Sequence, residues 1–389
     1  AEILIKLSLI MLGLSLIVML FAPLVTKALA FGFSPETIAL AVPLVRINFW
    51  YLLAIFIVTL LSALLQYKNH FATTAFSTAL LNISMITALL LALNLDQKSA
   101  AMYLSWGVVA GGMLQVLSHI IALKRLNLLR LLNLGIVKFA KGKRAKAKGF
   151  WQNFGHGIIG SSANQLSDFI STFIASFLAT GAISYLYYAN RIFQLPLALF
   201  AIALSTAIFP KIAKAIKSKN DTNAINLLKK SFSLLFFLLI FSTIGGFVLA
   251  NEIIWLLFQR GEFNTNNTIE SAKVLQMYML GLLPFGLYKL FSLWLYAKMQ
   301  QKIAAKIAIY SLFINTALCL LLFKPLGASG LALAGSISGL FLLGYAIFVF
   351  GIRQFLDIIF NRINLITIIL AVIFGYLLIE LRNIIYANL

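Results

Sequence analysis

Residues 184–209 read SYLYYANRIFQLPLALFAIALSTAIF, an apolar run that contains a single charged residue, Arg191. A helix needs roughly 20 consecutive apolar residues to cross the hydrocarbon core of a bilayer. The stretch meets that length, and most of its polar residues fall in the first half. It therefore predicts a membrane-spanning helix with one polar section.

The rest of the chain repeats this pattern. Of 389 residues, 62% are hydrophobic and 11% charged, whereas a soluble domain is nearer half apolar and a quarter charged. The apolar runs predict an all-α polytopic membrane protein with about 11 transmembrane helices. The expected spans are 4–22, 44–66, 73–94, 100–123, 153–178, 184–209, 231–250, 270–297, 303–323, 328–350 and 363–380.

The net charge of +21 lies mostly between these spans. If the first helix runs outward from the cytoplasm, the cytoplasmic connections hold 21 Lys and Arg residues and the outer ones 7. This bias follows the positive-inside rule and sets the orientation. With no nucleic-acid motif present, we expect no nucleic-acid partner. Cys319 is the one cysteine, so the sequence offers no disulfide framework.

A basic, leucine-containing connection at 124–150 divides the chain into two lobes. We expect an N-terminal lobe of four helices at 1–123, a C-terminal lobe of six at 151–351, and one extra helix within 352–389. The connection is typical of an amphipathic helix on an anionic cytoplasmic leaflet, with a solvated linker as the alternative. The start at Ala1 favours a chain that begins partway through a longer protein.

Charged and polar groups inside a bilayer are costly and mark functional positions. In the span at 153–178, the side chains of Ser161, Asn164, Gln165, Asp168 and Thr172 recur at three- and four-residue steps, on one helical face. This face is interpreted as a cavity wall or a cation or proton site. A hydrogen-bonded packing seam is the alternative.

In the span at 184–209, Tyr187, Asn190, Arg191 and Gln194 gather on one side. The forked guanidinium of Arg191 suits a phosphate or carboxylate. The alternatives are an ion pair with Asp168 and a side chain that reaches outward to the interface.

The span at 270–297 carries Lys289, Ser292 and Tyr296 at similar steps, shortly after Pro284. Lys289 is interpreted as a cavity cation, or alternatively as a lysine that reaches the cytoplasmic interface. Helices broken by proline, here Pro196 and Pro284, are common at transporter sites. The small-residue pairs Gly107/Gly111 and Gly335/Gly339 predict close helix packing.

Two intramembrane cations against one acid favour an anionic, phosphate-bearing substrate. Membrane enzymes that act on prenyl diphosphates need carboxylates to hold Mg²⁺, and only Asp168 lies deep in a span. Because the motifs of hydrolases, metalloproteases and P-loop proteins are also missing from the sequence, we expect no enzyme and no cofactor.

Several blocks resemble one known family. They are LLNISM at 80–85, ASFLATGAISYLYYANRIFQLPLALFAIALSTAIFP at 175–210, LFQRGEFN at 257–264 and FKPLGASGLALAGSI at 323–337. In order and spacing these resemble the MurJ (MviN) family of lipid II flippases, within the multidrug, oligosaccharidyl-lipid and polysaccharide exporter superfamily. The likeness runs from about residue 1 to 350. It also suggests that the first two family helices, which carry several cavity arginines, are missing from this chain.

The resemblance implies two helical lobes around a central cationic cavity in the bacterial inner membrane. It implies alternating access that carries lipid II, an undecaprenyl-diphosphate-linked muropeptide, to the outer leaflet for cell wall synthesis. Where the family has Tyr-Tyr-Ala-Asp-Arg, this chain has Asn190 before Arg191, and Gln194 stands where an acid is common. Asp168 and Asn315 match positions that bind Na⁺ in some relatives, although Cys319 falls where a further acid would help.

We therefore expect a lipid II flippase in which Arg191 and Lys289 contact the diphosphate. The expected substrate site also includes Asn190, Gln194, Gln165 and Ser292, and Asp168 with Asn315 is the candidate Na⁺ site. Na⁺ or the membrane potential supplies the energy, and the expected partners are lipid II and membrane lipids, with protein partners undetermined. The alternatives are an exporter of another lipid-linked oligosaccharide, of the O-antigen or capsule type, and a non-transporting membrane scaffold.

Overall fold

The computed structural model describes residues 2–141 and 165–387. Within these ranges every regular element is a helix, and nine helices are long and apolar enough to cross a membrane. The expected all-α polytopic fold is confirmed. Two expected spans, 303–323 and 328–350, lie in one long helix, and the span expected at 153–178 falls partly outside the described residues.

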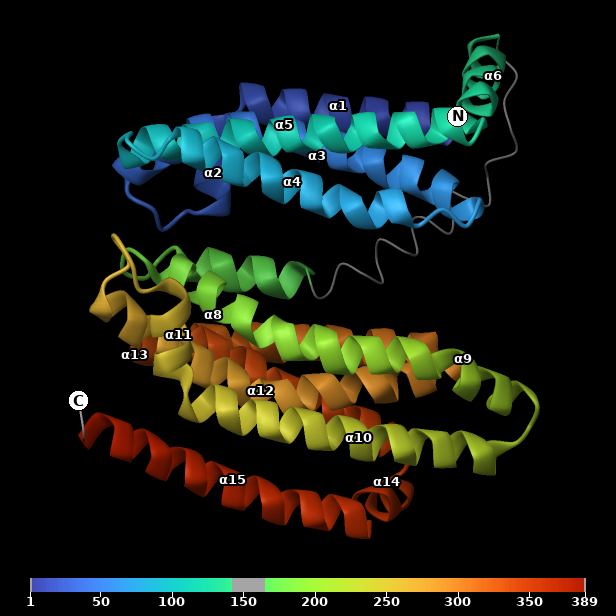
Figure 1. Ribbon diagram of the computed structural model, residues 1–389, viewed down its shortest axis with the longest axis vertical. Helices are drawn as coiled ribbons and strands as arrows, with labels where there is room; N and C mark the ends of the chain where they lie inside the picture. Colours follow the sequence, from blue (N-terminus) through green and yellow to red (C-terminus); the bar gives the residue numbers. More distant parts are fainter. Residues whose placement is uncertain (1, 142–164, 388–389) are drawn as a thin grey trace. The chain divides into compact units, whose positions relative to one another are not determined.

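The chain divides into two compact units, Ala1–His156 and Gly157–Leu389. The first unit contains α1 (Glu2–Leu20), α2 (Ala22–Leu29), α3 (Pro35–Tyr67), α4 (Ala72–Leu91), α5 (Gln97–Arg125) and α6 (Leu128–Ala140). In Figure 1, α1, α3, α4 and α5 lie side by side along their lengths, and both views place α6 across the end of this bundle. Much of the bundle's outer surface is exposed Leu, Ile and Phe, as a lipid-facing surface requires.

Helix α6 lies within the expected connection at 124–150, of which residues 142–150 fall outside the described ones. A small buried cluster fixes it to the bundle: Leu128 packs with Leu61 and Leu65 of α3 and with Leu123 of α5. Leu129 and Leu132 pack against the same cluster, whereas Leu131, Leu134 and Val137 of this helix are exposed.

Polar side chains cap the helices that follow loops. Ser34 accepts a hydrogen bond from the backbone of Thr37 at the start of α3, and Asp96 accepts one from Ser99 at the start of α5. Hydrogen bonding from the side chain and backbone of Ser99 lowers the pKa of Asp96. These caps fix where each helix begins.

The glycines of α5 permit close helix contact, as the sequence predicts. A Cβ at Gly107 would lie 2.5 Å from the Cβ of Ala88, and one at Gly111 would lie 2.8 Å from Leu81. Only glycine permits this separation between α5 and α4.

A polar cluster is buried inside the first unit. His119 is fully buried; its Nδ1 is 2.8 Å from the carbonyl oxygen of Gln115 and its Nε2 is 2.8 Å from the hydroxyl of Ser62. The carbonyl can only accept, so Nδ1 carries a proton and donates. The Gln115 amide in turn donates to the carbonyl of Ser77, which links α3, α4 and α5.

The second unit contains a helical segment at 165–175, followed by α8 (Ala182–Pro196), the π-helix η1 (Leu197–Ile202), α9 (Ala203–Lys217), α10 (Asp221–Val248), α11 (Ala250–Phe258), α12 (Thr265–Ala297), α13 (Gln301–Phe350), α14 (Ile352–Ile359) and α15 (Arg362–Ala387). Its core is built around α12, whose buried Leu282, Leu290 and Phe291 join one large apolar cluster. Figure 1 shows α12 between α8 and α10.

Helix α13 is a hairpin of two spans. The backbone leaves helical geometry at Gly327, where φ is 59° and ψ is −137°, two residues after Pro325. The halves then pack against each other: Ser311 donates to the carbonyl of Ser338 at 3.3 Å, and the rings of Tyr310 and Tyr345 lie 6.2 Å apart. The two expected spans are therefore present as neighbours.

The second glycine pair behaves differently from the first. A Cβ at Gly339 would lie 2.8 Å from the ring of Phe285 in α12, whereas one at Gly335 would have no atom within 4 Å. Close packing in this pair is therefore limited to Gly339, because Gly335 borders a cavity.

Candidate functional site

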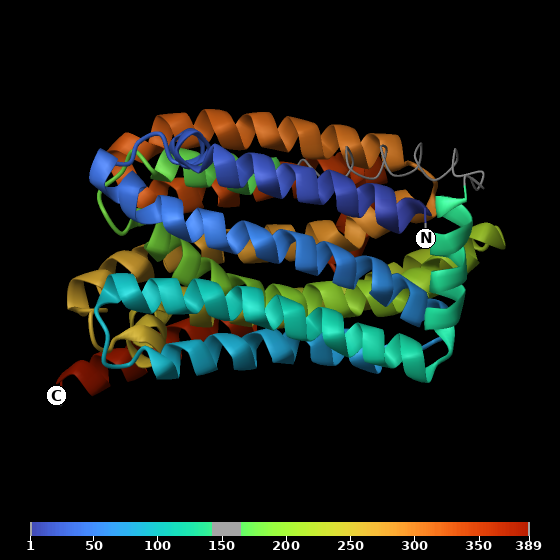
Figure 2. The ribbon, with the colours of Figure 1, turned by 90° about the horizontal axis from the view of Figure 1, so that it is seen from above.

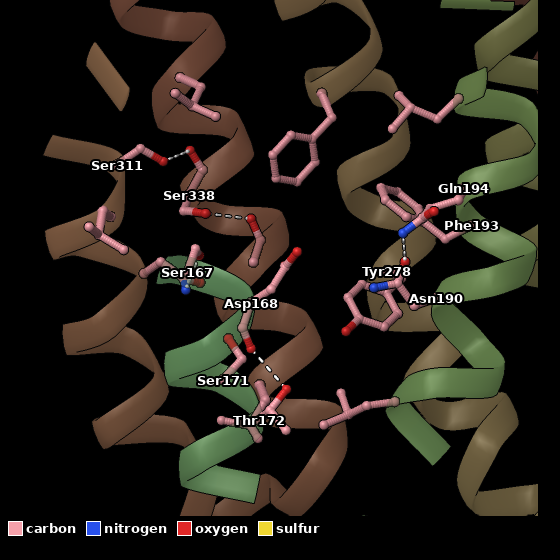
Figure 3. Close-up of a pocket in the computed structure, with 18 of the residues that line it drawn as sticks. Ser167, Asp168, Ser171, Thr172, Asn190, Phe193, Gln194, Tyr278, Ser311 and Ser338 are labelled. Carbon is pink, nitrogen blue, oxygen red and sulfur yellow. Dashed lines mark hydrogen bonds between the residues drawn. The ribbon is translucent and has the colours of Figure 1, made fainter. Parts of the chain in front are cut away.

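The second unit contains a partly open pocket of about 590 Å³. Its walls come from the 165–175 segment, α8, η1, α12 and both halves of α13 (Figure 3). The polar side chains that line it are Ser167, Asp168, Ser171, Thr172, Tyr187, Asn190, Arg191, Gln194, Tyr278, Tyr288, Lys289, Ser311, Asn315 and Ser338. A polar cavity within a membrane-spanning bundle is a candidate substrate site.

Helix α8 supplies the guanidinium of the pocket. It begins after Gly181, whose φ of 101° ends the preceding turn. One turn apart on this helix, Arg191 donates from Nη2 to the hydroxyl of Tyr187 at 3.0 Å, and its Cζ lies 4.5 Å from the centre of the Tyr187 ring. Hydrogen bond and cation–π contact together fix the plane of the guanidinium.

A neutral amide pair lies on the same helix. The Gln194 amide donates to the side-chain oxygen of Asn190 at 2.7 Å. The ring of Tyr278 from α12 stacks on Phe193 with centroids 5.5 Å apart and lies beside Asn190 in Figure 3. Figure 3 shows this group on one side of the pocket and the 165–175 segment on another.

Asp168 lines the pocket from the 165–175 segment. The ion pairs within 4.0 Å among the described residues include neither Asp168 nor Arg191. The alternative in which Arg191 is held by Asp168 is therefore not what the structure shows.

Lys289 lines the pocket from α12 and belongs to none of those ion pairs either. Two expected residues are not among the lining side chains. Ser292 is 6% exposed and donates to the backbone carbonyl of Lys289, so its hydroxyl is occupied within its own helix. Gln165 is exposed at the first described turn of its segment, outside the pocket.

The expected Na⁺ ligands both line the pocket. Asn315 is 2% exposed and donates from its amide to the hydroxyl of Ser167 at 2.8 Å. Its side-chain oxygen lies 3.9 Å from the sulfur of Cys319, which is 3.7 Å from the hydroxyl of Ser171. Among the described residues no group of three His, Cys, Asp or Glu side chains is placed to hold a metal.

One pocket wall contains an irregular backbone. Pro196 lacks the amide that would continue the α8 ladder, and residues Leu197–Ile202 adopt a π-helix. Such π segments are rare and recur at functional sites. In α12, Gly286 leaves space for the side chain of Leu239 from α10, because a Cβ at this position would clash with Leu239.

Sequence reasoning missed several lining residues. Tyr278, Ser311 and Ser338 lie in largely apolar stretches, and the packing of α12 and α13 brings them to the pocket. Two signals could have found members of this set. Ser311 is four residues before Asn315 and so shares its helix face. Tyr278 carries an aromatic hydroxyl at mid-span, and such a group usually finds a hydrogen-bond partner when buried.

Bilayer-length helices in both units and a cationic pocket inside one of them define a polytopic helical membrane transporter. The family model for the lipid II flippase MurJ matches residues 1–387. The chain belongs to the MurJ family.

Two relatives illustrate the similarity. A probable lipid II flippase MurJ of Helicobacter pylori is 50% identical over 346 residues, which covers 86% of this chain and 75% of that protein. A probable lipid II flippase MurJ of Buchnera aphidicola is 32% identical over 325 residues, with coverage of 82% and 61%.

Solved structures agree on the fold. A lipid II flippase MurJ in an inward closed conformation superposes with a TM-score of 0.76 at 24% identity, over 99% of this chain and 83% of that one. An inward-facing multidrug resistance MATE family transporter of the MOP superfamily superposes with a TM-score of 0.69 at 14% identity. This match covers 91% of this chain and 79% of the transporter. These two likenesses show the shared fold.

Proposed function

We propose that the chain is a lipid II flippase of the bacterial inner membrane. It carries the lipid-linked peptidoglycan precursor from the inner to the outer leaflet by alternating access. Membership of the MurJ family supports this function. The reaction moves a molecule and makes or breaks no covalent bond.

The observation that carries the proposal is a pair of cations in the pocket. Arg191 and Lys289 line the same cavity, and no ion pair within 4.0 Å among the described residues neutralises either. A charge held at bilayer depth costs at least about 2.5 kcal/mol on insertion scales. A diphosphate would offset that cost, because it brings the opposite charge.

Arg191 and Lys289 can contact the diphosphate in different ways. The guanidinium of Arg191 can bind two phosphate oxygens in a fork, while the ammonium of Lys289 acts as a point charge. The amides of Asn190 and Gln194 add neutral hydrogen bonds beside them. A cavity of about 590 Å³ falls within the size range of small-ligand sites. It can take the diphosphate with part of the headgroup, while the polyprenyl chain remains in lipid.

Asp168 is an acid in the same pocket, so it reduces the net positive charge that Arg191 and Lys289 give the pocket before substrate binds. Moving one unit charge across the membrane is worth about 2.3 kcal/mol per 100 mV, so the membrane potential is one source of drive. A Na⁺ ion held by Asp168 and Asn315 is the other source we propose.

The test is rescue of lipid II transport. The full-length protein is expressed in bacteria whose own lipid II flippase is depleted, and outer-leaflet lipid II is measured by its cleavage with an externally added hydrolase. We expect cleavage to return with the parent protein and to stay absent with Arg191→Ala/Lys289→Ala at equal membrane abundance. Lys273→Ala is the matched control, because Lys273 is exposed and pairs with Glu270 outside the pocket.

Two results would contradict the proposal. Failure to restore cleavage, with rescue of an O-antigen flippase mutant instead, would assign another lipid-linked oligosaccharide. Full rescue by the double variant would favour a scaffold role.

A further inference from the structure

Arg191 has an uncharged anchor. Its Nη2 donates to the Tyr187 hydroxyl at 3.0 Å, and the guanidinium lies over the Tyr187 ring at 4.5 Å. Tyr187 and Arg191 are four residues apart on α8, so one turn of helix sets their separation. The two contacts restrict both the position and the plane of the guanidinium.

The other polar residues of this helix face are engaged elsewhere. Gln194 donates to Asn190, and the ion pairs among the described residues give Arg191 no carboxylate. A carboxylate anchor would hold the guanidinium but cancel most of its charge. A phenol holds it and leaves the charge intact, with one of five N–H donors used.

Tyr187 is itself supported from behind. Its ring meets that of Tyr188 edge-on at 5.8 Å, and Tyr188 packs against Phe258 and Phe263 at 4.7 and 5.3 Å. Phe258 is the last residue of α11, and Phe263 lies in the connection between α11 and α12. The aromatic group therefore fixes the Tyr187 ring to a second part of the unit.

We infer that Tyr187 is a positioning residue for anion recognition, which holds the Arg191 guanidinium in the pocket without neutralising it. The inference rests on the proposed function, since it assumes that Arg191 binds a diphosphate. Tyr187 acts through Arg191 and needs no contact with the substrate. The ligand class it serves is a polyprenyl diphosphate.

A double-mutant cycle tests this role. The affinity of the full chain in detergent for undecaprenyl diphosphate is measured for Tyr187→Phe, Tyr187→Leu and Arg191→Ala, and for Tyr187→Leu combined with Arg191→Ala. We expect Tyr187→Phe to weaken binding about fivefold, because the hydrogen bond is lost, and Tyr187→Leu about thirtyfold, because the ring is lost as well. In the Arg191→Ala background, Tyr187→Leu should change affinity less than about twofold.

Tyr376→Phe is the matched control. Tyr376 is an exposed tyrosine of α15 and lies outside the pocket lining, so loss of its hydroxyl should leave affinity unchanged. Thermal unfolding of each variant checks that the fold persists.

The outcomes separate the two claims. If Tyr187→Leu weakens affinity by the same factor in the parent and in the Arg191→Ala background, the inference is overturned. Equal factors would mean that Tyr187 affects binding independently of Arg191. Weak binding by Arg191→Ala with unchanged binding by Tyr187→Leu would overturn the inference and leave the proposed function standing. Unchanged binding by Arg191→Ala would overturn both.

Discussion

Asn315 of α13 donates a hydrogen bond of 2.8 Å to the hydroxyl of Ser167 and so joins two walls of the pocket. Asn315 is almost fully buried, and its side-chain oxygen faces Cys319. This junction is neutral and lies in the same cavity as Asp168. The anionic character of that side of the pocket therefore depends on one carboxylate.

Adding a second carboxylate at this junction should weaken anion binding. Asn315→Asp keeps the shape of the side chain and places a negative charge in the pocket, so we expect affinity for undecaprenyl diphosphate to fall about tenfold. Equilibrium binding in detergent checks this. Asn223→Asp is the control, because Asn223 is exposed at the start of α10. The affinity of this variant for undecaprenyl diphosphate should equal that of the parent. Tighter binding of undecaprenyl diphosphate by Asn315→Asp would contradict the expectation that positive charge in the pocket attracts the ligand.

Removing the cations should act on binding rather than on folding. We expect Arg191→Ala and Lys289→Ala each to weaken diphosphate binding by about 2 kcal/mol, roughly thirtyfold, because each removes a charged hydrogen-bond donor. Isothermal titration with undecaprenyl diphosphate measures the loss. Melting temperatures within a few degrees of the parent would confirm that the fold survives. Binding that stays at the parent value in both variants would place the substrate elsewhere.

Close packing between α12 and α13 should depend on Gly339. Gly339→Ala forces a methyl group within 2.8 Å of the Phe285 ring, and we expect a loss of about 1–3 kcal/mol, read as a lower melting temperature in detergent. Gly344→Ala on the same helix has no atom within 4 Å of the added methyl and should be neutral. An equal fall in melting temperature for both variants would show that the stability change comes from helix propensity and not from the Phe285 contact.

The buried His119 should matter for the stability of the first unit. His119→Leu leaves the Ser62 hydroxyl without its partner, so we expect destabilisation of about 1–3 kcal/mol. Thermal unfolding of the full chain measures the change. Ser118→Ala is the control, since its hydroxyl bonds mainly to the carbonyl of Gln115 in its own helix. An unchanged melting temperature for His119→Leu would show that the cluster adds nothing to stability.

Much of the fold follows from hydropathy, because a bilayer imposes helix length directly. The runs at 303–323 and 328–350 were separable in the sequence by Lys324 and Pro325, and the structure bends there at Gly327. Packing was less predictable. Gly335 and Gly339 share one motif, yet only Gly339 meets a neighbouring helix. Spacing along a helix fixes which residues share a face but not what that face contacts.

The same limit applies to the pocket. Arg191 and Lys289 were predictable because a charge inside a span is costly wherever it lies. Ser292 shares a helix face with Lys289, but its hydroxyl bonds back to its own backbone. Tyr278 carried no charge and no repeat, and it enters the pocket through the packing of α12 against α8. The spacing of residues along one helix does not predict contacts of this kind between helices.

The most direct test of the account is an experimental structure of the full-length protein with lipid II bound. We expect density for the diphosphate within hydrogen-bonding distance of both Arg191 and Lys289, with the guanidinium still stacked on Tyr187. A diphosphate bound outside this pocket, with Arg191 and Lys289 both without contact to it, would contradict the central claim.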